Sequence, residues 1–81
     1  MKAYQILLGS PEGIKRFANV AALTTCEVRV EADGTIVDGK SVLALFSLPM
    51  NRQVTLRVSG DDEACEQFRR ALDPFFENDE S

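Results

Sequence analysis

Seven consecutive residues near the middle of the chain alternate strictly between apolar and charged side chains. Residues 26–32 read CEVRVEA, and this period of two predicts a strand with one buried and one solvent-exposed face. Asp33 and Gly34 follow directly and predict a two-residue hairpin turn, because glycine adopts the positive φ angle of such turns without steric cost. Residues 35–37 should therefore return as an antiparallel strand. This pattern disfavours a purely helical fold.

Two further strands and a first helix are expected around this hairpin. A short apolar run over residues 3–8 ends at a Gly-Ser-Pro sequence and predicts the first strand. Residues 53–59 alternate again and predict the last strand. From Glu12 onward, apolar side chains recur at steps of three and four, which indicates a helix of two to three turns that ends at Thr24.

Two more helices complete the predicted order of elements. Ser41 is a suitable N-cap for a short helix that stops before Pro49. The acidic residues 61–63 suit the start of a last helix, whose regular part should finish near Pro74. The resulting order is βαββαβα. It predicts an α+β fold in which a four-stranded antiparallel sheet carries three helices on one face.

Length and charge limit the domain organisation and the partners. The 81 residues are enough for one small domain, expected over residues 1–76 and followed by a disordered tail over residues 77–81. Nine basic against 13 acidic residues give a net charge of -4, so a nucleic-acid partner is not expected. No apolar run is long enough to span a membrane and no signal peptide is recognisable. We expect a cytoplasmic monomer without a membrane partner.

The chain contains no histidine. Histidine-dependent nucleophiles, imidazole acid–base catalysis and histidine-ligated metals are therefore excluded. Cys26 and Cys65 do not form a Cys-x-x-Cys motif, which indicates a reduced intracellular chain, and neither thiol is expected to be reactive. The acidic residues 61–63 lack the spacing of a calcium loop. We expect no catalytic residue, no metal site and no cofactor, and we do not expect the protein to be an enzyme.

This element order resembles the HPr family, the small bacterial phosphocarriers of the sugar phosphotransferase system. The stretches that carry the resemblance are residues 25–30 before the Asp33-Gly34 turn, residues 40–45 with Leu48, and residues 54–63. The resemblance implies an HPr-like open-faced β-sandwich. It also implies that Ser41 is the regulatory serine, phosphorylated in the family by an HPr kinase/phosphorylase-like kinase.

One departure from the family pattern concerns its phosphorylated histidine. The family carries Gly-x-His-x-Arg-Pro-Ala after the first strand, whereas residues 13–18 here read GIKRFA and the preceding loop is shorter. Glu12 adds negative charge where a phosphoryl group would meet the helix amides. Lys15 is a weak substitute, because an ammonium must lose its proton before it can attack. A phosphohistidine relay is therefore not expected.

The predicted partner-binding residues are Val42, Leu43, Phe46, Lys15 and Arg16. A two-turn helix cannot bury every large apolar side chain after Ser41, so some must contact a partner or lie exposed singly. In the family, this helix is a docking surface for enzymes and for a catabolite-control transcription regulator. The plainer interpretation is that Ser41 is only a helix cap and that the two cations form a solvated surface pair.

These observations favour a non-catalytic, regulatory HPr-like binding protein, linked to the phosphotransferase system or carbon catabolite control and switched at Ser41. An alternative is a scaffold or orphan HPr-like domain that is never phosphorylated. A third class, the acyl-carrier type, matches in size, acidity and a serine at a helix start. Those proteins are helical bundles, however, and the alternating strands count against them.

Overall fold

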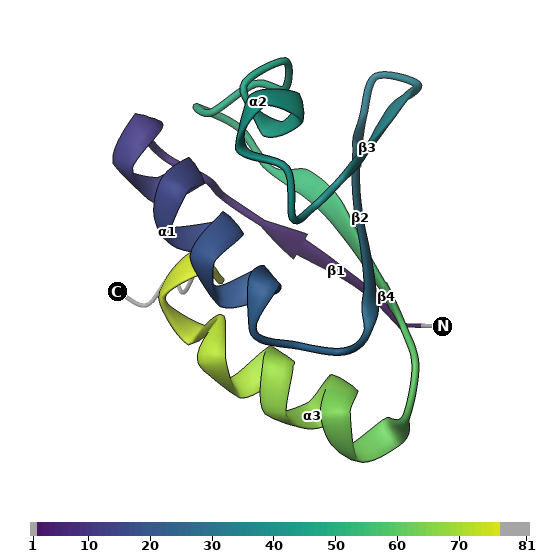
Figure 1. The fold of residues 1–81 in the computed structure, drawn as a ribbon. Coiled ribbons are helices and arrows are strands. Elements are labelled where there is room, and N and C mark those ends of the chain that lie inside the picture. Colours follow the sequence, from purple (N-terminus) through teal and green to yellow (C-terminus); the bar gives the residue numbers. More distant parts are fainter. Residues whose placement is uncertain (1, 77–81) are drawn as a thin grey trace.

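The computed structural model describes residues 2–76, so the tail predicted for residues 77–81 lies outside the described part of the chain. The strands are β1 (Lys2–Ile6), β2 (Glu27–Ala32), β3 (Thr35–Asp38) and β4 (Val54–Ser59). The helices are α1 (Pro11–Ala22), α2 (Val42–Leu45), α3 (Asp62–Ala71) and a 3₁₀ turn, η1 (Asp73–Phe75). All helices lie on one face of the sheet (Figure 1). The predicted open-faced α+β architecture is confirmed.

The four strands form one antiparallel sheet in the order β1-β4-β2-β3. The β2–β3 hairpin closes between Ala32 and Thr35, which face each other across the turn. Asp33 and Gly34 have φ angles of 54° and 82°, so the turn has the two positive φ angles that the sequence predicts. β4 pairs with β1 and β2 and occupies the centre of the sheet. An acyl-carrier-type helical bundle is therefore wrong for this chain.

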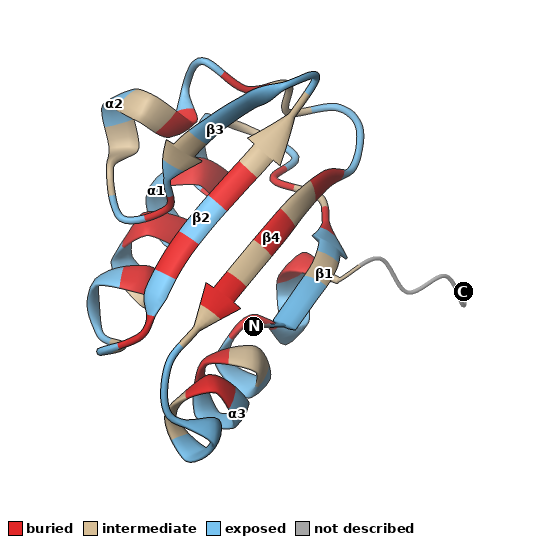
Figure 2. Cartoon of the chain, turned by 90° about the vertical axis from the view of Figure 1, so that its right-hand side faces the viewer, coloured by how far each residue is buried: buried red, intermediate tan, exposed pale blue. Residues whose placement is uncertain are grey.

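The core lies between the sheet and the helices (Figure 2). Alternate residues of β4, namely Val54, Leu56 and Val58, are buried, as the period of two requires. They pack under Phe17 of α1 and the aromatic side chains of the C-terminal segment. The Phe17 ring lies edge-on to Phe75, with centroids 5.6 Å apart.

Several element ends differ from the sequence prediction. α1 begins at Pro11 with Ser10 as its N-cap, because proline suits a first helical position where its missing N–H is not needed. β1 ends at Ile6, since the N–H of Leu7 donates to Phe75 O instead of β4. α2 ends at Leu45 because the next turns use i to i+3 hydrogen bonds, which tighten the chain.

No helix within residues 2–76 is long and apolar enough to cross a membrane.

Candidate functional site

Ser41 caps the short helix α2. Its backbone is extended, with φ -104° and ψ 112°, and its Oγ accepts a hydrogen bond of 3.2 Å from the N–H of Ala44. The carbonyl of Ser41 accepts the N–H of Leu45 at 3.0 Å. The side chain thus satisfies a helix amide that has no other intrahelical partner. Ser41 itself is half-buried.

The apolar side chains of α2 and its C-terminal turn are divided between core and solvent. Leu45 and Leu48 are buried, and Val42 is partly buried against the core. Leu43 is 85% exposed and Phe46 is 38% exposed. We refer to Val42, Leu43 and Phe46 as the α2 surface.

Lys15 and Arg16 lie exposed on the first half of α1, which packs against α2. Within residues 2–76, neither side chain forms an ion pair or a hydrogen bond. The structure therefore places the two cations on the element next to the α2 surface, without any polar link between them and Ser41.

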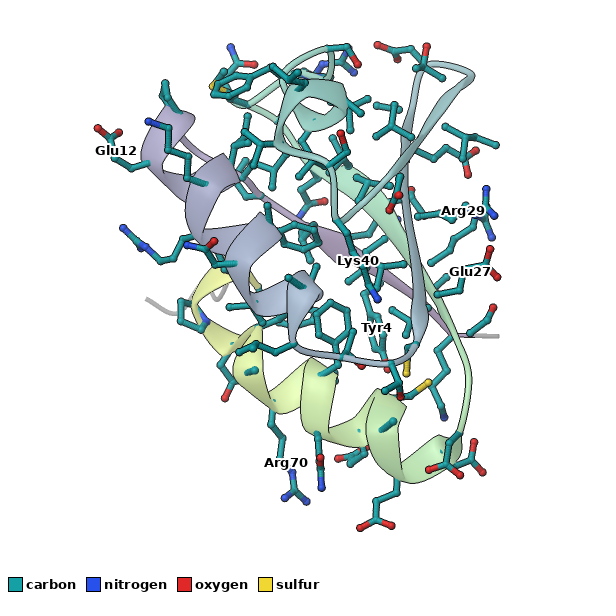
Figure 3. The ribbon with its side chains drawn as sticks, viewed as in Figure 1. Tyr4, Glu12, Glu27, Arg29, Lys40 and Arg70 are labelled. Carbon is teal, nitrogen blue, oxygen red and sulfur yellow. The ribbon has the colours of Figure 1, made fainter. Side chains whose placement is uncertain are left out.

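Lys40 has a structural role that the sequence does not reveal. The ammonium of Lys40, which is labelled in Figure 3, donates a 2.8 Å hydrogen bond to Thr24 O, 16 positions away. Its backbone N–H donates to Asp38 Oδ1. These bonds fix the residue before Ser41 to the segment that follows α1. A lysine beside a predicted cap is the only sequence signal, and it does not specify the distant carbonyl.

The N-terminus of α1 is closed by the chain's own groups. Ser10 Oγ accepts the N–H of Gly13 at 3.0 Å, and Glu12 lies in the first turn, at the outer edge of the molecule in Figure 3. A Cβ on Gly13 would lie 1.9 Å from Leu8 O, so this position has room only for glycine. The Ser10 cap leaves one fewer free amide for an anion at this helix end.

The groups whose pKa differs from its ordinary value are not members of the α2 surface. The carboxylate of Glu27 raises the pKa of Arg29, and that of Asp33 raises the pKa of Arg52. Burial, followed by the hydrogen bond between the Cys65 and Cys26 thiols, raises the pKa of Cys65. Among residues 2–76, no group of three or more His, Cys, Asp or Glu side chains could hold a metal ion.

Comparison with solved structures gives several similar proteins. HPr-C-His from Thermoanaerobacter tengcongensis has a TM-score of 0.74 at 26% identity, with 89% of this chain and 86% of that chain covered. The Bacillus subtilis catabolite-repression protein Crh has a TM-score of 0.65 at 27% identity, covering 90% and 88%. The phosphocarrier protein HPr of Bacillus anthracis shares the fold, with a TM-score of 0.64 at 20% identity, covering 86% and 94%.

A comparison with curated protein sequences finds no match. The family model described as the PTS HPr component phosphorylation site matches residues 13–78, most of the chain. Because this match runs from the first turn of α1 past η1, it includes Ser41 and the α2 surface. The chain therefore belongs to the HPr family of the phosphotransferase system.

Proposed function

We propose that this protein is a regulatory, non-enzymatic binding member of the HPr family, linked to the phosphotransferase system or to carbon catabolite control. It docks on partner proteins through the α2 surface, and Ser41 is its phosphorylation site. The observation that carries the proposal is the exposure of Leu43 and Phe46 beside a serine-capped helix start, in a chain that has no histidine.

The missing histidine argues for binding instead of phosphoryl relay. A relay through imidazole needs a side chain that this sequence lacks. At the N-terminus of α1, the Ser10 side chain already accepts a hydrogen bond from a helix amide, and Glu12 adds negative charge. Both features disfavour binding of a phosphoryl group there. The same fold therefore retains a docking surface without the chemistry of the family's carrier site.

The exposed apolar side chains support a docking role for α2. Covering a leucine with apolar surface contributes about 1.5–3 kcal/mol, and Leu43 has most of its surface available. Lys15 and Arg16, on the neighbouring helix, are suited to acidic groups at the rim of a partner. Apolar contact at α2 would supply affinity, and the cations would orient the partner.

Ser41 is suited to act as a switch. A phosphate on its Oγ would add about -1.5 to -2 charges at neutral pH. The group would lie at the start of α2 beside Leu43, so it would change the charge of the docking surface directly. The similar Bacillus subtilis protein Crh is named for catabolite repression, which supports this choice of pathway over a general scaffold.

The phosphorylation proposal is tested with two phosphoryl donors on the full chain. An HPr kinase/phosphorylase-like kinase with ATP should label the wild type and leave Ser41→Ala unlabelled. Enzyme I with phosphoenolpyruvate should transfer no label. Label from Enzyme I would contradict the absence of a carrier site, and a labelled Ser41→Ala variant would place the kinase site elsewhere.

The alternative is an HPr-like scaffold that is never phosphorylated. It predicts no label from the serine kinase, together with partner binding that still depends on Leu43. A monomer is the proposed binding unit. The Bacillus subtilis protein Crh forms a domain-swapped dimer, so size-exclusion chromatography with light scattering distinguishes the two forms here.

A further inference from the structure

The two cysteines of the chain meet in space. Their sulfur atoms are 3.5 Å apart, although the residues are 39 positions apart in the sequence. Cys26 is 2% exposed and Cys65 is 3% exposed. Cys26 directly precedes β2, and Cys65 lies near the start of α3, so the pair lies at the end of the sheet away from α2 (Figure 1).

Both cysteines are attached to backbone that is held by hydrogen bonds. The N–H of Cys26 donates to Thr24 Oγ1 at 3.2 Å, and the next residue, Glu27, is already paired in the sheet. The N–H of Cys65 donates to Asp61 O at 2.9 Å, and Asp61 also caps α3. The two sulfurs are thus held near each other by ordered backbone on both sides.

The segment between β4 and α3 lies directly against Cys26. A Cβ on Gly60 would lie 3.0 Å from Cys26 Sγ and 3.2 Å from its Cα, which shows how closely this backbone passes over Cys26. An external thiol compound therefore has no space beside Cys26, whereas the thiol of Cys65 is already in contact. This geometry favours a bond between the two cysteines over a stable adduct with a small molecule.

We propose that Cys26 and Cys65 form a reversible disulfide that fastens α3 to the start of β2 when the chain meets an oxidising low-molecular-weight disulfide. A disulfide has an S–S distance of about 2.05 Å, so the sulfurs must approach each other by about 1.5 Å from their separation of 3.5 Å.

The exchange takes place in two steps. One cysteine thiolate attacks a sulfur of the reagent and releases one reagent thiolate, leaving a mixed disulfide. The second cysteine thiolate then attacks the protein sulfur of that mixed disulfide and releases the other reagent thiolate. Two protein thiols are oxidised, one reagent disulfide is reduced to two thiols, and the two cysteine protons pass to the released thiolates.

Burial makes the first step slow. It raises the pKa of the Cys65 thiol, so little thiolate exists near neutral pH and attack requires the first turn of α3 to open. The reduced pair is therefore stable in a reducing compartment and responds only to sustained oxidation.

The test uses the full chain incubated with excess glutathione disulfide, alkylated with N-ethylmaleimide and weighed as an intact protein. The main oxidised product should be a monomer about 2 Da lighter than the reduced chain, without glutathione or maleimide. Its thermal midpoint should be at least about 10 °C higher, and dithiothreitol should reverse the change. Cys26→Ala and Cys65→Ala should show neither the light product nor the higher midpoint.

A second arm removes the barrier caused by burial. The chain is unfolded and refolded in the same glutathione buffer, which exposes both thiols before they are enclosed. Recovery of reduced chain, a glutathione adduct or a disulfide-linked dimer as the main product would overturn the proposal. An intramolecular disulfide with a lower thermal midpoint would also overturn it, because the bond would then strain the fold.

Discussion

Replacing Leu43 by aspartate tests the docking role of α2 most directly. Leu43 exposes 85% of its surface, and full burial of a leucine is worth about 1.5–3 kcal/mol. Covering that fraction on binding contributes about 1.3–2.5 kcal/mol. Because about 1.4 kcal/mol corresponds to a tenfold change in Kd, Leu43→Asp should weaken binding about 10- to 60-fold, before any cost of burying the carboxylate.

Leu23 provides the matched control for this experiment. It is 86% exposed at the C-terminal cap of α1, away from α2. Isothermal titration calorimetry of wild type, Leu43→Asp and Leu23→Asp against an HPr kinase/phosphorylase-like kinase should give a weaker Kd for Leu43→Asp only. Equal losses in both variants, or unchanged binding of Leu43→Asp, would refute the assignment of the surface. Thermal unfolding should show all three chains folded, because both leucines contribute little to the core.

Three further predictions concern the stability of the fold. Ser41→Ala removes the hydrogen bond from the Ala44 N–H and should lower the free energy of unfolding by about 1 kcal/mol, or the Tm by about 4–8 °C. Ser41→Asp retains a cap and should melt near the wild type. Equal losses of stability in both variants would contradict the capping role. Gly13→Ala would place a Cβ 1.9 Å from Leu8 O and should cost about 1–3 kcal/mol in denaturant unfolding, while Asn19→Ala, exposed on the same helix, should be near neutral. Under reducing conditions, burial raises the pKa of Cys65 above its ordinary value of 9.0, so the folded state holds this proton more tightly, and the free energy of unfolding should fall as the pH rises through 9 and beyond. Cys65→Ala should lack this fall, and a wild type that becomes more stable at high pH would refute the assigned direction.

Local patterns predict most of this fold. The alternation in β2, the Asp33-Gly34 turn and the capping serine each depend on neighbouring residues, and each has the predicted structure. The predicted ends of the helices and strands are less accurate, because contacts with residues distant in sequence determine where each element ends. β1 ends where the N–H of Leu7 donates a hydrogen bond to Phe75 O. The sequence pattern within residues 3–8 cannot predict this contact.

In the candidate site, too, features that depend on neighbouring residues are predicted better than contacts between distant segments. The small size of the helix after Ser41 predicts that some of its apolar side chains stay outside the core, and the structure buries Leu45 and Leu48 but leaves Leu43 exposed. The bond from Lys40 to Thr24 O and the contact between Cys26 and Cys65 depend on segments that meet only in the folded chain. Sequence reasoning treated the cysteines one at a time and therefore missed their pairing.

The position of β4 in the sheet determines the order in which this chain can fold. β2 and β3 are joined by a two-residue turn and can pair early, but Lys2 of β1 has its partner at Val58 in β4. Contacts between residues so far apart in sequence slow folding, because a long loop must close before they form. During synthesis, β1 therefore lacks its strand partner until β4 has left the ribosome. Exposed strand edges favour pairing between different chains during this time. Slow translation of the segment between β3 and β4 would lengthen that vulnerable interval.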